Sequence, residues 1–95
     1  MHNCIIELVN KHLYLLNDVE YVYIFGSILD SNKMPNDIDI FIVYFEYTDI
    51  LQKQINEFVS SLETASKLRV DLTVLSFDEE KQVHFLEKIK YIQLK

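Results

Sequence analysis

The stretch from Tyr23 to Tyr44, YIFGSILDSNKMPNDIDIFIVY, contains the only glycine and the only proline of the chain. It also places two aspartates, Asp37 and Asp39, one residue apart at the start of an apolar run. Alternate residues of a β-strand point to the same face, so the two carboxylates would lie about 6 to 7 Å apart on one side. Strand propensity does not favour aspartate, and like charges at that range repel each other. The pattern therefore indicates a site in which a positively charged group or ion lies between the two carboxylates.

A third carboxylate lies in RVDLTVLS, residues 69–76, where Asp71 again stands near the start of an expected strand. If this strand neighbours the first and Asp71 faces the same way, three carboxylates converge on one cavity. Clusters of carboxylate oxygens suit Mg²⁺ or Mn²⁺. The constellation predicts, in outline, a two-metal phosphoryl-transfer site.

The FGS sequence upstream supplies candidate phosphate contacts. Gly26 would let the backbone approach a ligand closely, and Ser27 at the start of a helical turn offers a hydroxyl and backbone N–H groups. Lys33, in the following loop, is a further candidate phosphate contact, and an exposed side chain is the alternative reading. Metal ions would neutralise a triphosphate that the Gly-Ser turn holds.

The rest of the chain alternates helical and strand patterns without repeats or linkers. Expected elements are a helix over 2–16, a strand over 20–25, a short helical turn over 27–30 capped by Ser27, a strand over 37–44, a helix over 48–66 capped by Thr48, a strand over 69–76 and a last helix over 77–93. This order predicts an α/β fold in which helices pack on a small sheet of about three strands. In the last helix, Phe85 and Leu94 fall outside the main apolar stripe and suggest a second apolar face for a partner.

Composition narrows the functional classes. The 95 residues fit one domain, and a 49% hydrophobic content favours a packed globule. A net charge of -6 and a single arginine, Arg69, argue against a general nucleic-acid binder. Cys4 is alone, which excludes an internal disulfide, and the N-terminal segment MHNCIIELVNKHL does not read as a signal peptide or membrane span. We therefore expect a cytoplasmic protein.

The order of these motifs resembles the nucleotidyltransferase superfamily of the DNA polymerase β type: a strand, Gly26-Ser27, a loop, Asp37-Ile38-Asp39, and then Asp71 on a later strand. More narrowly, it is similar to minimal nucleotidyltransferase (MNT) proteins, which often serve as antitoxins to HEPN-domain toxins. The resemblance covers most of the chain and assigns residues 1–95 to one minimal nucleotidyltransferase domain.

The resemblance implies a mixed sheet with antiparallel pairing. It also implies Asp37 and Asp39 as metal ligands, Asp71 as a ligand that helps to activate the attacking hydroxyl, and contacts of Gly26 and Ser27 with the β and γ phosphates. The implied activity is Mg²⁺- or Mn²⁺-dependent transfer of AMP from ATP to a hydroxyl of a partner protein, for which a HEPN-family toxin is the expected partner.

The chain departs from the family pattern directly after Gly-Ser. Members usually carry a small residue, an arginine and a glycine there, whereas this chain reads ILDS over residues 28–31. Two alternatives to an enzyme therefore stay open. One is a catalytically degenerate fold that neutralises or scaffolds a partner by binding alone, and the other is a structural subunit whose acidic cluster holds a cation without catalysis.

Overall fold

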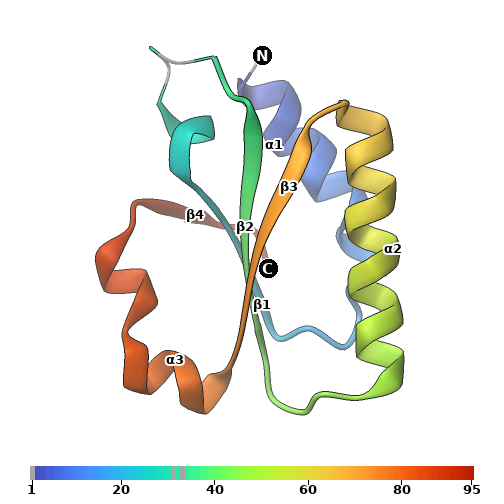
Figure 1. Cartoon of the computed structure of the whole chain (residues 1–95), viewed down its shortest axis with the longest axis vertical. Helices are drawn as coiled ribbons and strands as arrows, with labels where there is room; N and C mark the ends of the chain where they lie inside the picture. Colours follow the sequence, from blue (N-terminus) through green and yellow to red (C-terminus); the bar gives the residue numbers. More distant parts are fainter. Residues whose placement is uncertain (1, 31, 33) are drawn as a thin grey trace.

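The protein folds around a four-stranded sheet flanked by helices (Figure 1). This computed structural model describes residues 2–30, 32 and 34–95, with side chains from residue 4 onward. The elements are α1 (His2–His12), η1 (Leu13–Leu15), β1 (Tyr21–Phe25), η2 (Gly26–Leu29), β2 (Asp37–Tyr44), α2 (Asp49–Ser66), β3 (Arg69–Ser76), α3 (Phe77–Val83), η3 (Phe85–Lys88) and β4 (Tyr91–Gln93).

The strand order is β3-β2-β1-β4. Strand β1 pairs antiparallel with both β2 and β4, whereas β2 and β3 run parallel. Parallel neighbours need a crossover, and α2 provides it. Its start is fixed by the expected cap, because the Thr48 hydroxyl accepts a 3.0 Å hydrogen bond from the Leu51 N–H. The mixed α/β fold predicted from the sequence is confirmed.

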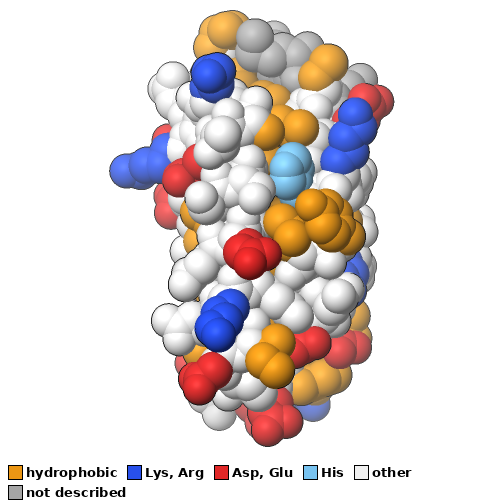
Figure 2. Space-filling view, turned by 90° about the vertical axis from the view of Figure 1, so that its right-hand side faces the viewer, with side chains coloured by type: hydrophobic (Ala, Val, Ile, Leu, Met, Phe, Trp, Pro, Cys, Tyr) orange, Lys and Arg blue, Asp and Glu red, His pale blue; other side chains and the backbone are white. Residues whose placement is uncertain are grey.

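The first face of the sheet carries the main hydrophobic core, against which α1 and α2 pack (Figure 1). Alternate residues of β2 point to this side, and Ile38, Ile40 and Ile42 are fully buried there. From α2, Leu51, Phe58 and Leu62 are likewise inaccessible to solvent. Figure 2 shows the outer surface on the α2 side, where acidic, basic and hydrophobic side chains are interspersed. No helix within the described residues has the length and apolar character needed to cross a membrane.

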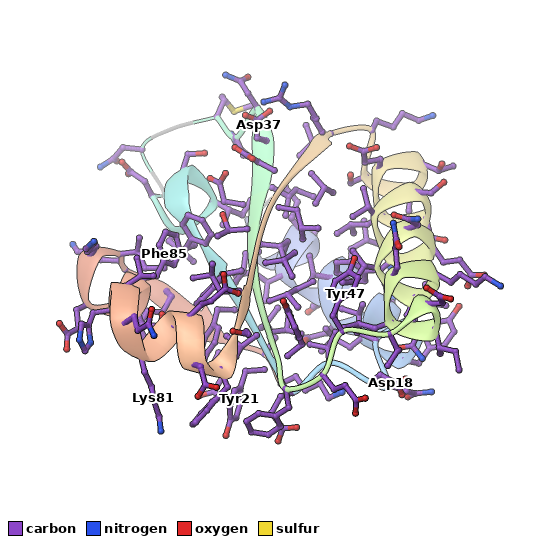
Figure 3. The ribbon with its side chains drawn as sticks, turned by 60° about the horizontal axis from the view of Figure 1, so that its bottom comes forward. Asp18, Tyr21, Asp37, Tyr47, Lys81 and Phe85 are labelled. Carbon is purple, nitrogen blue, oxygen red and sulfur yellow. The ribbon has the colours of Figure 1, made fainter. Side chains whose placement is uncertain are left out.

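The second face of the sheet carries a smaller, aromatic cluster. Tyr23 from β1 stacks on Phe41 from β2, with ring centroids 5.6 Å apart. Phe85 of η3 packs on the same cluster, at 4.6 Å from Phe41 and 5.5 Å from Phe25. Figure 3 shows Phe85 pointing toward the sheet from the α3–η3 segment. This segment therefore covers only part of the second face.

The C-terminal prediction was wrong in detail. A single helix over 77–93 was expected, but α3 ends at Val83, and His84 adopts a left-handed conformation with φ 54°. The Glu80 carboxylate accepts a 3.0 Å hydrogen bond from the Phe85 N–H, which stabilises the break. The chain then forms η3 and β4, so the sheet has four strands and not about three.

The expected partner-binding face on this segment is also wrong. Phe85 is half-buried in the aromatic cluster, and Leu94 packs against the main core. Backbone pairing holds Leu94 in place, because its N–H donates a 2.7 Å hydrogen bond to the Val22 carbonyl. Both residues stabilise the fold of this chain.

Two further boundaries differ from expectation. The helix expected over 2–16 is α-helical only to His12 and continues as the 3-10 turn η1. The short helical turn after β1 exists as η2, but it begins at Gly26, and its N-cap position is Phe25, without a side-chain cap. Ser27 is therefore inside the turn rather than its cap.

Replacing Phe85 tests this account of the C-terminal segment. The Phe85→Ala variant should lose about 2 kcal/mol in free energy of unfolding, less than a fully buried phenylalanine because the ring is half-buried. The control is Val83→Ala, since 43% of Val83 is exposed and it should change stability by less than about 0.5 kcal/mol. Urea unfolding measures both, and equal losses would contradict the observed packing.

Candidate functional site

The three predicted carboxylates lie at one end of the second sheet face. The register pairs Asp39 of β2 with Asp71 of β3, so their side chains project from adjacent strands to the same side. Asp37 precedes Asp39 by two residues on that face, and Figure 3 shows it at the start of β2. This end lies beyond the aromatic cluster, where α3 and η3 leave the sheet uncovered (Figure 1).

Gly26 meets the same site from β1. The register places Phe25 opposite Asp39, and Gly26 follows with a positive φ of 81°. A Cβ built on Gly26 would overlap the Oδ2 and Cγ atoms of Asp39. The glycine is therefore needed both for its left-handed backbone and for the close approach of the Asp39 carboxylate. This contact joins the Gly-Ser turn and the aspartate pair into one site.

Asp39 is the electrostatic centre of this site. Burial raises the pKa of its carboxyl above the usual value, and the negative charges of Asp71 and Asp37 raise it further. The guanidinium of Arg69 lowers the same pKa, but this effect is the smallest of the four. This arrangement of charges disfavours the ionised form of Asp39, and a bound cation would relieve that cost.

Arg69 belongs to the site, although the sequence analysis treated it only as the lone arginine. The register pairs Arg69 with Asp37, and its Nη2 atom lies 3.7 Å from Asp37 Oδ2. The two side chains are 71% and 38% exposed, so this ion pair contributes little to stability. The guanidinium of Arg69 nevertheless places a positive charge beside Asp37, at the end of the sheet where the carboxylates lie.

The described residues do not contain a preformed metal cage. Within them, no three acidic, histidine or cysteine side chains come close enough together to hold an ion. Asp37, Asp39 and Asp71 lie at the same end and on the same face of the sheet, but their carboxylates do not surround a single point. Ser27 lies in η2 next to Gly26, and Lys33 lies outside the described residues.

A hollow of about 370 Å³ opens beside the Gly-Ser turn, and Gly26, Leu29, Asp30 and Lys90 line it. Lys90 comes just before β4, whose residue Tyr91 pairs with Phe25. The helix expected over 77–93 would have kept Lys90 away from Gly26, so the sequence did not indicate it as a site residue. Only the pairing of β4 with β1 could have linked Lys90 to Gly26.

Removing the charge of Asp39 should stabilise the metal-free protein. Because the folded state raises the pKa of Asp39, ionisation costs folding free energy at pH values above that raised pKa. Asp39→Asn should therefore gain on the order of 1 kcal/mol near neutral pH, the scale for partly exposed charges. The gain should shrink as the pH falls toward the ordinary value of 3.8, where the wild-type carboxyl is neutral too.

Urea unfolding in the presence of a chelator, repeated at several pH values, measures this dependence. Glu57→Gln is the matched control, since it removes one acidic charge from an exposed position of α2 away from the site. A gain of the same size in both variants, or one independent of pH, would contradict the repulsion at Asp39.

Solved structures similar to this chain come from nucleotidyltransferases and toxin-antitoxin complexes. A crystal structure of a toxin-antitoxin with AMP-PNP matches with a TM-score of 0.57 and 26% identity over 99% of this chain and 72% of that chain. A crystal structure from Shewanella oneidensis matches with a TM-score of 0.59 and 23% identity, covering 97% of this chain and 70% of the other. A putative nucleotidyltransferase from Sulfolobus solfataricus matches with a TM-score of 0.56 and 23% identity, covering 97% and 80%.

No curated protein matches the chain at a significant level. The family model of the polymerase beta nucleotidyltransferases, in contrast, matches residues 3–92. The match takes in the Gly-Ser turn, the aspartate pair on β2 and Asp71 on β3. The chain therefore belongs to the polymerase beta nucleotidyltransferase family.

Proposed function

We propose that this protein transfers AMP from ATP to a hydroxyl group of a partner protein, as the antitoxin of a HEPN/MNT toxin-antitoxin pair. One observation carries the proposal. Asp39 faces Asp71 across parallel strands, Asp37 shares their face, and the backbone of Gly26 approaches the Asp39 carboxylate. This places a turn suited to phosphates beside a group of carboxylates suited to cations.

The chemistry of these donors fits Mg²⁺ or Mn²⁺. All three side chains offer hard carboxylate oxygens, and the raised pKa of Asp39 marks a position where a cation would offset repulsion. When bound, the metal would neutralise phosphate charge and favour ionisation of the acceptor hydroxyl. Asp37, Asp39 and Asp71 are the residues that would hold it.

The remaining roles fall to groups of this chain. Gly26 and Ser27 would contact the β and γ phosphates and orient the triphosphate so that its α phosphorus faces the acceptor. Asp71, which is exposed, would take the proton of the attacking hydroxyl. The acceptor oxygen then bonds to the α phosphorus, the bond from that phosphorus to the bridging oxygen breaks, and pyrophosphate leaves with the electron pair.

The choice of nucleotide and partner rests on resemblance and charge. The toxin-antitoxin structure that is 26% identical to this chain was solved with AMP-PNP, an ATP analogue. The net charge of -6 disfavours nucleic-acid acceptors. A HEPN-family toxin, acting with this chain in the cytoplasm, is therefore the acceptor that we propose.

A second candidate function is neutralisation of the partner by binding alone. Two observations favour it. Residues 28–31 lack the arginine and glycine that family members usually carry, and the three carboxylates do not form a cage within the described part of the chain. A degenerate site of this kind would keep the fold and the partner-binding surface but lose nucleotidyl transfer.

Transfer of label tests the choice between the two functions. With Mg²⁺ and ATP labelled at the α phosphate, the wild-type protein should label the HEPN-family toxin that we propose as its partner. The combined variant Asp37→Asn and Asp39→Asn should reduce labelling by at least about 100-fold, the effect of losing groups that stabilise transition-state charge. Autoradiography of the separated proteins measures the transfer.

The same variant should still form the complex, because both substitutions lie in the site and are nearly isosteric. Glu57→Gln serves as the charge control and should label the toxin as the wild type does. Neutralisation of the toxin in cells decides the mechanism: a double variant that protects cells as well as the wild type would show that catalysis is dispensable.

A further inference from the structure

Lys90 lines the hollow beside Gly26. Among the four described residues that line the hollow beside the Gly-Ser turn, it is the only base. Its position follows from the sheet: Tyr91 pairs with Phe25 in the antiparallel register, so the residue before Tyr91 lies across from the residue after Phe25, which is Gly26. Figure 1 shows the start of β4 passing close to the turn formed by η2.

Charged side chains of both signs lie near the Gly-Ser turn. Asp30 lines the hollow, and its Oδ1 atom accepts a 3.0 Å hydrogen bond from the Asn32 N–H. Asp39 does not line the hollow, but its carboxylate lies against Gly26, which does. Arg69 is on β3, at the other edge of the sheet from β4, and is paired with Asp37. Gly26 therefore has the Asp39 carboxylate as one neighbour and lines a hollow together with Lys90, whose ammonium group would lie within reach of a triphosphate held at the turn.

We propose that Lys90 binds the pyrophosphate portion of the nucleotide and takes the part that an arginine after Gly-Ser would otherwise play. The inference rests on the proposed function. Lysine suits this position because its ammonium is a compact charge on a long flexible stem, able to reach phosphate oxygens from a neighbouring strand. Its exposed side chain has the freedom to do so.

Lys90 would act on the leaving group. As the acceptor oxygen bonds to the α phosphorus, the bond to the bridging oxygen breaks and negative charge grows on pyrophosphate. An ammonium group against those oxygens stabilises the charge through a charge-assisted hydrogen bond. No proton needs to leave Lys90 in this step, because the acceptor proton goes to Asp71.

Calorimetric titration of the full chain tests the assignment. The probes are α,β-methylene-ATP, which resists transfer, and AMP, which lacks the pyrophosphate portion, each with Mg²⁺. Lys90→Gln should bind α,β-methylene-ATP about tenfold more weakly than the wild type, equivalent to about 1.4 kcal/mol. Its affinity for AMP should be unchanged. Lys88→Gln, two residues away and exposed in η3, is the matched control and should bind both probes as the wild type does.

Lys90→Arg keeps the positive charge and should retain the affinity for α,β-methylene-ATP, which separates a charge effect from a folding defect. If the wild type binds α,β-methylene-ATP and Lys90→Gln binds it equally well, the role of Lys90 is wrong while the proposed function stands. An equal loss for AMP and α,β-methylene-ATP would also overturn it. If the wild type binds neither probe, the nucleotide site itself is refuted, and Lys90 with it.

Discussion

The parallel pairing of β2 with β3 is the constraint on which the site depends. It sets Asp39 opposite Asp71 and Asp37 opposite Arg69. Burial of Asp39 disfavours its charged form, and the negative charge of Asp71 on the adjacent strand adds to that cost. The pairing nevertheless persists because the other face of the same strands is buried in the core where α2 packs, with Ile38, Ile40 and Ile42 from β2 and Val70 from β3. The hydrophobic core thereby holds the carboxylates together against their repulsion.

The turn at Gly26 extends the constraint to β1. Since a side chain at Gly26 would overlap Asp39, the antiparallel pairing of β1 with β2 and the conformation of the turn depend on each other. Strand β4 then brings Lys90 to the other side of the turn. Three separate strand pairings thus position acidic and basic groups around one end of the sheet.

Strands β2 and β3 could be predicted from the sequence because their patterns are strong. The runs at 37–44 and 69–76 alternate regularly, and both strands have those bounds in the structure. The C-terminal segment failed because its helical composition was overridden by the left-handed residue His84, by packing of Phe85 on the aromatic cluster and by pairing with β1. Such long-range contacts leave no local periodic signal.

In the candidate site, too, local spacing could be predicted from the sequence, whereas contacts between distant segments could not. The spacing of Asp37 and Asp39 on one strand fixes their common face, so the sequence predicts it. Arg69 and Lys90 were missed because their approach to the site depends on register between strands that are distant in the chain. Even the role of Gly26 is broader than its sequence context indicates, since its contact with Asp39 is visible only in three dimensions.

The central claim is that a divalent cation binds at the acidic end of the sheet. Paramagnetic Mn²⁺, added in substoichiometric amounts to isotopically labelled protein, tests it by broadening the NMR signals of nearby amides. The account predicts selective broadening at Gly26, Ser27, Asp39 and Asp71, abolished in Asp39→Asn. Broadening spread evenly over the acidic surface, or unchanged by Asp39→Asn, would contradict it.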